Sequence, residues 1–201
     1  MINNDFVTKI QYGLFFLSTK SERGDNASVI NTVMQITDTP KRIAVCVNKD
    51  SYNCEIIKNT GALNISVLNE NVTFDDIKRF GFQSGRDVDK FDGYTSELGR
   101  SENGIVYFKS VANTFISATV FNSVDCGTHI MFLCDVVEAD VINDVPSITY
   151  EYYHKNIKVS AAPKKKGYVC KICGYVYEGD ELPEDFICPW CKHGADAFEE
   201  K

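Results

Sequence analysis

The last 35 residues of the chain carry four cysteines in two C-x-x-C pairs, Cys170 with Cys173 and Cys188 with Cys191. Two such pairs, 14 residues apart, are typical of a single tetrahedral site in which four thiolates hold one metal ion. A segment this short cannot bury enough apolar surface to offset its chain entropy, so the metal must supply much of its folding free energy. The sequence therefore predicts a small metal domain with these four cysteines as ligands.

The spacing alone leaves the metal open, because iron and zinc both accept four thiolates. Residues 167–201 hold 8 acidic residues and 3 lysines, a net charge of −5, whereas zinc ribbons that bind nucleic acid tend to be basic. Aromatic residues surround the cysteines: Tyr168, Tyr175, Tyr177, Phe186, Trp190 and Phe198. We expect an electron carrier here, with a zinc-bound interaction module as the alternative.

Charge and composition argue against several classes of protein. The chain has 21 Lys and Arg against 28 Asp and Glu, a net charge of −7, so we expect no nucleic-acid partner. Apolar runs such as residues 43–47 are far shorter than the roughly 18 to 20 residues that cross a bilayer, so we expect no membrane span. The N-terminus lacks the features of a secretory signal, and eight cysteines then suit metal ligands or free thiols in a reducing cytoplasm.

Most of the chain before residue 160 is expected to form strands. Segments rich in β-branched and aromatic residues occur at residues 13–18, 30–37, 42–48, 62–68, 105–112, 115–124, 130–139 and 148–153. Two short helices are expected, one after Ser51 to about residue 59 and one after Thr73 to about residue 80, because each hydroxyl can cap the helix that follows. Many short strands with few helices predict a mainly β fold, a closed or half-closed barrel.

A linker is expected between this part and the metal domain. Residues 160–167, S-A-A-P-K-K-K-G, contain small residues, a proline, a run of like charge and a glycine, without hydrophobic periodicity. The chain is thus predicted to divide into a domain of residues 1–159, a linker of residues 160–167 and a metal domain of residues 168–201. Fully extended, the linker spans at most about 26 to 29 Å, enough for the small domain to swing between two partners.

One segment of the larger domain suits a phosphate group. Residues 48–55, N-K-D-S-Y-N-C-E, place hydroxyl, amide and lysine groups where a strand ends and a helix begins. Free N–H groups and the positive end of the helix dipole favour an anion at such a turn. An ordinary capped helix is the alternative reading of this pattern. Residues 26–37 add a strand-like stretch with small polar residues that could leave backbone groups open to a flat polar ring.

The C-terminal pattern Y-x-C-x-x-C-G-Y-x-Y, followed by L-P-x-x-F-x-C-P-x-C, resembles rubredoxin over residues 167–200. The resemblance implies a single iron that carries one electron between its ferrous and ferric forms. The stretch between the cysteine pairs is shorter than in free-standing rubredoxins and is similar to the compact form appended to larger redox proteins. Lys192 stands where the pattern has a glycine, which places the backbone geometry beside the last cysteine in question.

The larger domain resembles the flavin reductase-like, FMN-binding split-barrel family, in its anaerobe branch of flavoredoxins and high-molecular-weight rubredoxins. The resemblance spans residues 5–158 and rests on the segments above, with F-G-F-Q-S-G-R-D-V-D-K-F at 80–91, G-T-H at 127–129 and Y-E-Y-Y-H at 150–154. It implies an FMN-binding split β-barrel with short helices, and a homodimer with FMN at its interface.

The resemblance assigns site residues by position. The residues expected to approach the flavin ring and ribityl chain are Asn26, Thr32, Gln35 and Thr37, and those expected to hold the phosphate are Asn48, Ser51, Tyr52 and Asn53. Asn53 and Cys54 replace the threonine and histidine usual at their places. Arg86 and Lys90 are candidate cations for the phosphate or a flavin carbonyl. His129 is the catalytic candidate, beside the ring, where it orients a nicotinamide or supplies a proton. Tyr153 covers the flavin or packs in the dimer interface.

Flavin and iron on one chain imply an electron-transfer flavoprotein. Electrons pass from NAD(P)H or a reductase through FMN to iron, and on to a terminal acceptor that the resemblance suggests is a flavo-diiron protein reducing oxygen or nitric oxide. The chain has no G-x-G-x-x-G and no Walker motif, so any pyridine nucleotide must stack on the FMN itself. The alternatives are an NAD(P)H:flavin or ferric reductase with an accessory metal domain, and the zinc-bound interaction module.

Overall fold

The computed structural model describes residues 3, 6, 9–158, 167–179 and 181–200 of the chain. The chain forms two compact units, residues 1–153 and residues 154–201. The predicted domain of residues 1–159 and the predicted metal domain of residues 168–201 stay predictions. Residues 160–166 of the predicted linker lie outside the described residues.

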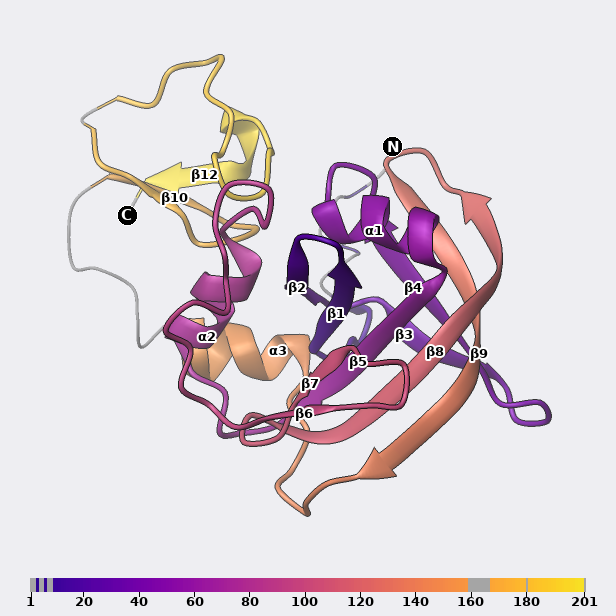
Figure 1. Ribbon diagram of the computed structural model, residues 1–201. Coiled ribbons are helices and arrows are strands. Elements are labelled where there is room, and N and C mark those ends of the chain that lie inside the picture. Colours follow the sequence, from indigo (N-terminus) through magenta and orange to yellow (C-terminus); the bar gives the residue numbers. More distant parts are fainter. Residues whose placement is uncertain (1–2, 4–5, 7–8, 159–166, 180, 201) are drawn as a thin grey trace. The chain divides into compact units, whose positions relative to one another are not determined.

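The larger unit is built on one antiparallel sheet of seven strands in the order β2-β1-β5-β8-β9-β4-β3 (Figure 1). Its strands are β1 (Phe15–Ser21), β2 (Gly24–Ile30), β3 (Val33–Thr37), β4 (Arg42–Asn48), β5 (Ala62–Leu68), β8 (Ala112–Asp125) and β9 (His129–Val141). A two-stranded ribbon joins β6 (Leu98–Arg100) and β7 (Val106–Phe108). The helices are α1 (Tyr52–Thr60), α2 (Phe74–Gly81) and α3 (Tyr150–Tyr152), the last continued by a π-helix over Tyr153–Lys158.

The sheet curls around one hydrophobic core. Strands β1 and β4 are separated by three others in the sheet order, yet Leu17 of β1 and Val45 of β4 belong to the same buried cluster. Helix α1 packs against β1, β2 and β4 and buries Ile57 in that cluster, so it spans the two sides of the curled sheet (Figure 1). The predicted mainly β barrel with short helices is confirmed.

Both predicted helices form where the hydroxyl residues precede them. Thr73 caps α2 through a capping box, since its hydroxyl accepts from the Asp76 N–H and the Asp76 carboxylate accepts from the Thr73 N–H at 2.9 Å. Helix α1 ends at Gly61, whose φ of 67° is the left-handed conformation that closes a helix. Ser51 occupies the N-cap of α1 without a side-chain capping bond, a difference that bears on the site below.

The predicted strand at residues 148–153 is wrong. Residues from Tyr150 onward are helical, because the Thr149 hydroxyl accepts a hydrogen bond from the Tyr152 N–H at 3.0 Å and caps the turn. The strand preference of tyrosine reflects packing in a sheet more than an intrinsic backbone preference, so local capping overrides it here. The predicted strand at residues 30–37 covers β3 and only the last residue of β2. The rest of β2 was not predicted, because its polar first residues pair with β1 across a tight turn.

An aromatic cluster covers the other face of β1. Phe16 of β1, Phe80 of α2 and Phe108 of β7 pack with ring centroids 4.4 to 5.0 Å apart. Phe91, in the loop after α2, lies 5.2 Å from Phe80. Tilted and edge-to-face pairs contribute about 0.5 to 1.5 kcal/mol each beyond the area they bury. The cluster therefore fixes the loop of residues 82–97, which carries two of the predicted site residues.

The smaller unit has little core of its own. Its sheet has the order β11-β10-β12, with β10 (Tyr168–Cys170), β11 (Val176–Tyr177) and β12 (Phe198–Glu200), and a 3-10 turn covers Ala195–Ala197. The buried cluster consists of Cys170, Cys188 and Ala197, with a few half-buried aromatic residues packed on it. This apolar area is too small for a stable fold without a metal.

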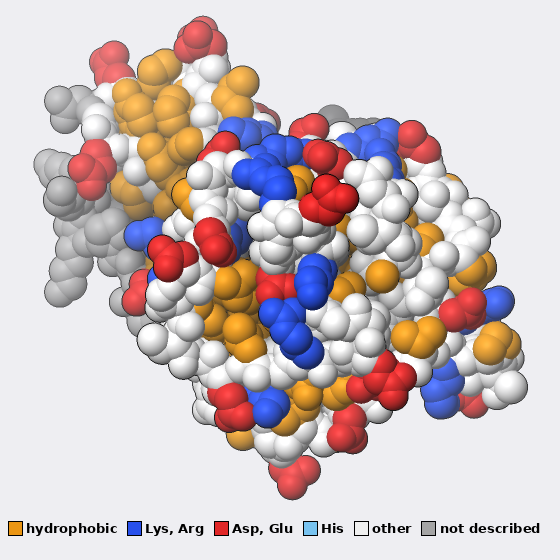
Figure 2. Space-filling view, in the orientation of Figure 1, with side chains coloured by type: hydrophobic (Ala, Val, Ile, Leu, Met, Phe, Trp, Pro, Cys, Tyr) orange, Lys and Arg blue, Asp and Glu red, His pale blue; other side chains and the backbone are white. Residues whose placement is uncertain are grey.

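Figure 2 shows acidic and basic side chains mixed over the viewed face of the larger unit, without a continuous basic stripe. Among the described residues, no helix is both long enough and apolar enough to cross a membrane.

Candidate flavin site and metal centre

The turn between β4 and α1 presents hydrogen-bond donors at a helix N-terminus. The Asn48 side chain accepts from the Asp50 N–H at 2.8 Å, and the Asn48 carbonyl accepts from the Ser51 N–H at 3.0 Å, which shapes the turn. Within the described part of the chain, the N–H groups of Tyr52 and Asn53 have no partner, and the Ser51 hydroxyl makes no capping bond. These donors, together with the helix dipole, suit an anion such as a phosphate.

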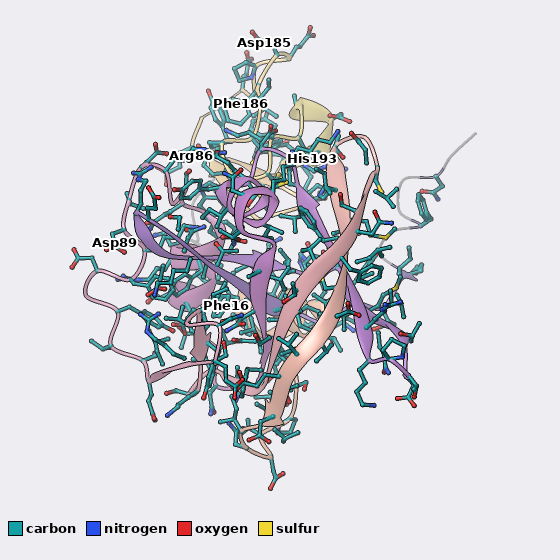
Figure 3. The ribbon with its side chains drawn as sticks, turned by 45° about the vertical axis from the view of Figure 1, so that its right-hand side comes forward. Phe16, Arg86, Asp89, Asp185, Phe186 and His193 are labelled. Carbon is teal, nitrogen blue, oxygen red and sulfur yellow. The ribbon has the colours of Figure 1, made fainter. Side chains whose placement is uncertain are left out.

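Arg86 lies beside this turn (Figure 3). Its Nη1 donates to the Asp50 carbonyl at 2.8 Å, and its Nη2 donates to the Glu55 carboxylate at 2.9 Å. The guanidinium carbon lies 5.2 Å from the centre of the Tyr52 ring. Arg86 thus places a guanidinium, paired with Glu55, at the start of α1, where the sequence predicts a phosphate.

The Asn53 side chain is engaged inside the barrel. It is fully buried, and its Oδ1 accepts from the Thr19 hydroxyl and the Asn26 amide, each at 2.6 Å. Its Nδ2 donates to the Leu17 carbonyl at 2.9 Å and to the Ser28 hydroxyl at 2.8 Å. All four hydrogen-bonding positions of the amide are filled, so only the backbone N–H of Asn53 remains for a phosphate. The side chain instead ties the first turn of α1 to β1 and β2.

Two predicted flavin contacts are largely buried. Asn26 is 5% exposed, and a Cβ at Gly85 would clash with its side-chain oxygen, so the loop can approach β2 only through a glycine. Tyr153 is also 5% exposed, and its N–H donates to the Thr149 carbonyl at 3.0 Å. The contact of each side chain with a flavin stays a prediction.

Lys90 is buried, and its ammonium group donates hydrogen bonds to backbone carbonyls. Its Nζ donates to the Ala27 carbonyl at 2.8 Å and to the Phe80 carbonyl at 3.0 Å. Burial lowers the pKa of Lys90 to about 8. The side chain joins β2 to the end of α2, so the structure gives the predicted flavin cation a role in holding the loop that it belongs to.

We expect Lys90 to make the free energy of unfolding rise between pH 8 and pH 10. The pKa in the folded chain is about 8 against an ordinary value of 10.5, so the unfolded chain binds more protons in this window. The free energy of unfolding therefore increases by about 1.4 kcal/mol per pH unit in this window. This stabilisation is present at high pH and is lost as the pH falls to 8. Urea unfolding of the wild type and of Lys90→Met at pH 7 to 10 measures it. A difference between the two proteins that stays constant with pH would disprove the assignment.

His129 lies at the same end of the barrel as the phosphate turn. It begins β9 and pairs directly with Asn48, the last residue of β4. Its Nδ1 lies 2.9 Å from the Thr128 hydroxyl, and the Thr128 carbonyl accepts from the Lys49 N–H at 3.0 Å. Strand pairing therefore brings the predicted proton donor next to the predicted phosphate site from a distant part of the sequence.

The other predicted flavin contacts, Thr32, Gln35 and Thr37, lie at opposite ends of β4. The Thr32 hydroxyl donates to the Cys46 carbonyl at 2.9 Å, near the end of the strand that carries Asn48. Gln35 and Thr37 pair with the start of β4, and both are exposed. At about 3.3 Å per residue, the two ends of this strand lie about 20 Å apart. The structure therefore brings Thr32 to the candidate site and places Gln35 and Thr37 elsewhere on the same chain.

Arg23 is a residue at the site that the sequence analysis missed. Its guanidinium carbon lies 5.7 Å from the centre of the Tyr52 ring. Among the described residues, Arg23 forms no ion pair with a carboxylate. Its Nη2 donates to the Arg86 carbonyl at 3.1 Å. The available signal was the turn S-E-R-G-D at residues 21–25, which is recognisable as a hairpin only when β2 is recognised as a strand.

The smaller unit brings together the four predicted metal ligands. The Sγ atoms of Cys170, Cys173, Cys188 and Cys191 all lie within 4.8 Å of one another. The Cys170–Cys191 sulfur distance is 3.5 Å and the Cys173–Cys188 distance is 3.4 Å. Ligands of a tetrahedron with metal–sulfur bonds of about 2.3 Å are about 3.8 Å apart, so the four sulfurs fit one four-coordinate metal ion.

Each cysteine pair lies in a turn closed by a backbone hydrogen bond. The Gly174 N–H donates to the Cys170 carbonyl at 2.7 Å, and the Lys192 N–H donates to the Cys188 carbonyl at 2.9 Å. The φ angles are 79° at Gly174 and 63° at Lys192. Lys192 therefore adopts the left-handed conformation of the glycine that it replaces in the rubredoxin pattern, and the turn is kept at a cost in backbone strain.

Backbone N–H groups donate hydrogen bonds to three of the four sulfurs, those of Cys173, Cys188 and Cys191. Burial raises the pKa of Cys188, but hydrogen bonds from the backbone N–H groups of Cys191 and Trp190, together with those from the thiols of Cys173 and Cys191, bring that pKa below its ordinary value. Burial raises the pKa of Cys173, and a hydrogen bond from the Tyr175 N–H offsets part of this increase. A metal that binds here displaces protons and is then held by sulfurs that already receive hydrogen bonds, a donor set that fits iron.

Lys192→Gly is expected to stabilise the smaller unit by about 0.5 to 1 kcal/mol. The left-handed conformation costs a non-glycine residue roughly 1 to 2 kcal/mol, and the larger chain entropy of glycine offsets part of the gain. Lys171→Gly is the matched control, because Lys171 is exposed and has no positive φ, and it should destabilise by a similar amount. Thermal unfolding of the metal-loaded proteins compares them, and equal stability of the two variants would be inconsistent with strain at Lys192.

Known proteins match both units. Residues 7–160 match the flavin reductase like domain, and residues 168–199 match the rubrerythrin, rubredoxin-like domain. The chain is 36% identical to high molecular weight rubredoxin from Moorella thermoacetica. The alignment is 223 positions long and covers 95% of this chain and 96% of that protein. It is also 36% identical to ferric-chelate reductase (NAD(P)H) from Archaeoglobus fulgidus over 146 residues, 73% of this chain and 85% of that one.

A solved structure shares the fold of the barrel. Flavoredoxin from Methanosarcina acetivorans superposes with a TM-score of 0.61 and 20% identity over 70% of this chain and 75% of that one, a likeness of fold. The flavin reductase-like barrel and the rubredoxin-like four-sulfur site support flavin and iron as the bound groups. The chain belongs to the flavin reductase-like family and carries a rubredoxin-like domain at its C-terminal end.

Proposed function

We propose that the chain is an electron-transfer flavoprotein that passes electrons from NAD(P)H or a reductase through FMN to iron, and from iron to a terminal acceptor. FMN takes up electrons in pairs and releases them singly, whereas a four-thiolate iron carries one at a time. The observation that carries the proposal is the presence of a flavin reductase-like barrel and a rubredoxin-like four-sulfur site on one chain.

FMN is the proposed flavin because the turn at α1 suits one phosphate group. The Ser51 hydroxyl and the N–H groups of Tyr52 and Asn53 donate to it, and Arg86 supplies positive charge from the side. His129, paired with Asn48 across the strands, orients a nicotinamide or holds a proton near the ring.

The names of similar proteins support NAD(P)H as the donor. One relative is a ferric-chelate reductase (NAD(P)H), and a structure with the same fold, at a TM-score of 0.63, is an NADH:FAD oxidoreductase from Streptomyces globisporus. The chain lacks a separate dinucleotide motif, so in the proposed reaction the nicotinamide stacks on the FMN.

The acceptor we propose is a basic redox protein, such as a flavo-diiron oxygen or nitric oxide reductase. Ile172 and Ile187, each next to a metal ligand in sequence, are 38% and 62% exposed. Figure 2 shows hydrophobic side chains gathered on the smaller unit with acidic residues at the margin. An apolar patch with an acidic margin supports brief docking on a basic surface, weakened by salt.

We further propose a homodimer that works in the cytoplasm of an anaerobe. Large apolar side chains remain exposed on the barrel strands, with Met34 at 60%, Val137 at 59% and Val141 at 66% exposed. Exposed apolar strand surface of this kind supports burial against a second copy. None of the eight cysteines, all among the described residues, forms a disulfide, which suits a reducing compartment.

The proposal is tested by rapid mixing of NADH with the full chain, loaded with FMN and iron, in the absence of air. We expect the iron absorbance to bleach after the flavin absorbance, at a rate unchanged by tenfold dilution of the protein. A rate proportional to protein concentration would show that electrons pass between separate molecules, and would remove the reason for having both sites on one chain.

An NAD(P)H:flavin or ferric reductase with an accessory metal domain is the second candidate. Its support is the 36% identity to ferric-chelate reductase over 73% of this chain. Turnover of free FMN or ferric chelate that Cys188→Ser leaves undiminished would favour this candidate. Reduction of a protein acceptor that the same substitution abolishes would favour the relay.

A further inference from the structure

A pocket of about 330 Å³ opens between the β1–β2 turn, the start of α1 and the loop after α2. Its lining includes Arg23, Tyr52, Phe91 and three carboxylates, those of Asp25, Asp87 and Asp89. The volume lies at the lower end for small-molecule sites, enough for a nucleoside-sized group rather than a whole dinucleotide. Only Tyr52 is shared with the proposed phosphate turn, so the flavin contacts described above leave this pocket unexplained.

The two carboxylates in the loop are open to a ligand. Among the described residues, neither Asp87 nor Asp89 forms an ion pair, and the side chain of Asp89 accepts only the Phe91 N–H, at 2.9 Å. Both residues are exposed. The third carboxylate of the lining, Asp25, is by contrast held by Arg100 at 2.6 Å. Asp87 and Asp89 therefore keep acceptor oxygens for hydroxyl groups.

Flat and cationic groups complete the pocket. The Tyr52 and Phe91 rings line it, and Phe91 is fixed by its contact with Phe80 at 5.2 Å. The Arg23 guanidinium lies 5.7 Å from the Tyr52 ring and uses one N–H on the Arg86 carbonyl. Its other N–H groups can reach a phosphate oxygen at the pocket, since no described carboxylate pairs with it.

These groups together match adenosine attached to a phosphate. Aromatic rings stack on adenine, carboxylates accept hydrogen bonds from the ribose hydroxyls, and the Arg23 guanidinium binds the phosphate. We infer that this pocket binds the adenosine half of NADH. The inference rests on the proposed function, because it names the part of the proposed donor that the barrel recognises away from the flavin.

The carboxylates also set a preference between the two nicotinamide nucleotides. NADPH carries a phosphate on the 2′ oxygen of this ribose, where NADH carries a hydroxyl that donates a hydrogen bond. Asp87 and Asp89 accept from the hydroxyl and repel the phosphate, so the pocket both attracts NADH and disfavours NADPH.

Calorimetric titration of the full chain, loaded with FMN and iron, tests the pocket directly. The probes are 5′-AMP and adenosine 2′,5′-bisphosphate, and we expect 5′-AMP to bind at least tenfold more tightly. The double substitution Asp87→Asn and Asp89→Asn should weaken 5′-AMP about tenfold, as loss of a charged hydrogen bond does, and remove most of the difference between the probes. Asp92→Asn, exposed in the same loop but outside the pocket, is the control that should leave both affinities unchanged.

The outcomes separate this inference from the proposed function. No binding of 5′-AMP, or equal binding of the two probes, overturns the pocket. A second comparison uses NADH and reduced nicotinamide mononucleotide, which lacks the adenosine half. Flavin reduction equally fast at low concentrations of either donor also overturns the pocket and leaves the relay standing. Binding of 5′-AMP without flavin reduction by NADH or NADPH supports the pocket and removes the proposed donor.

Discussion

Cys188→Ser is expected to release the metal and unfold the smaller unit while the barrel keeps its fold and its flavin. The four sulfurs lie within 4.8 Å of one another, and Cys188 and Cys170 form most of a core that is otherwise a single alanine. Metal binding to a small thiolate domain supplies about 10 to 16 kcal/mol of folding free energy, which a hydroxyl ligand does not replace. Metal analysis, together with amide hydrogen exchange in residues 168–200, measures the loss.

Cys126→Ser is the matched control for this prediction. Cys126 is an exposed free thiol in the hairpin between β8 and β9, outside the four-sulfur cluster. Its replacement should leave metal content, hydrogen exchange and flavin content unchanged. A Cys188→Ser protein that retains metal in a folded smaller unit would show that the other cysteines suffice and that the predicted ligand set is wrong.

Asn53→Leu is expected to destabilise the barrel by about 3 to 5 kcal/mol and to weaken flavin binding. The substitution keeps the number and branching of the side-chain heavy atoms but leaves the Thr19 hydroxyl, the Asn26 amide and the Leu17 carbonyl without their buried partner. Each unsatisfied buried group costs about 1 to 3 kcal/mol, so the combined loss is at the upper end for a single substitution. Urea unfolding measures the stability, and flavin fluorescence measures the affinity at a concentration of urea where the protein is folded.

Asn59→Leu provides the comparison on the same helix. Asn59 is exposed near the end of α1, so its substitution should change stability by no more than about 0.5 kcal/mol. If Asn53→Leu were as mild as Asn59→Leu, the four hydrogen bonds of Asn53 would not be what fixes α1 on β1 and β2.

The metal centre is the part of the molecule that the sequence predicts best, because its chemistry is local. Cysteines two residues apart share one turn, and each turn needs a left-handed residue after it. Gly174 meets this need in an obvious way, whereas Lys192 does not, and only the structure shows that Lys192 adopts the same conformation at φ 63°.

The barrel was predictable as a class and less so in its connections. Continuous apolar strands such as β4 and β5 match their predicted bounds, since their side chains are buried in the core. The polar start of β2 and the tyrosine-rich α3 do not, because their conformations depend on pairing with β1 and on the Thr149 cap. The alternation of apolar and polar residues and the composition of a segment do not show which distant residues it pairs with.

The candidate flavin site shows what residue type cannot reveal. Asn48 and His129 meet because β4 and β9 pair, which follows from the fold. Asn53 and Lys90 have polar side chains that would suit a phosphate, yet both are turned into the protein to satisfy buried backbone and side-chain groups. The direction of a side chain at a helix start or in a loop is set by its packing partners, so the sequence leaves it open.

The most direct test of the relay is the absorbance spectrum of the full chain purified without air, with metal analysis, before and after addition of NADH. The account predicts iron in the four-cysteine site together with bound FMN, ferric-thiolate bands overlapping the flavin bands, and bleaching of both by NADH. Zinc in that site with flavin bands alone would contradict the relay and leave a flavin reductase that carries a structural or docking module.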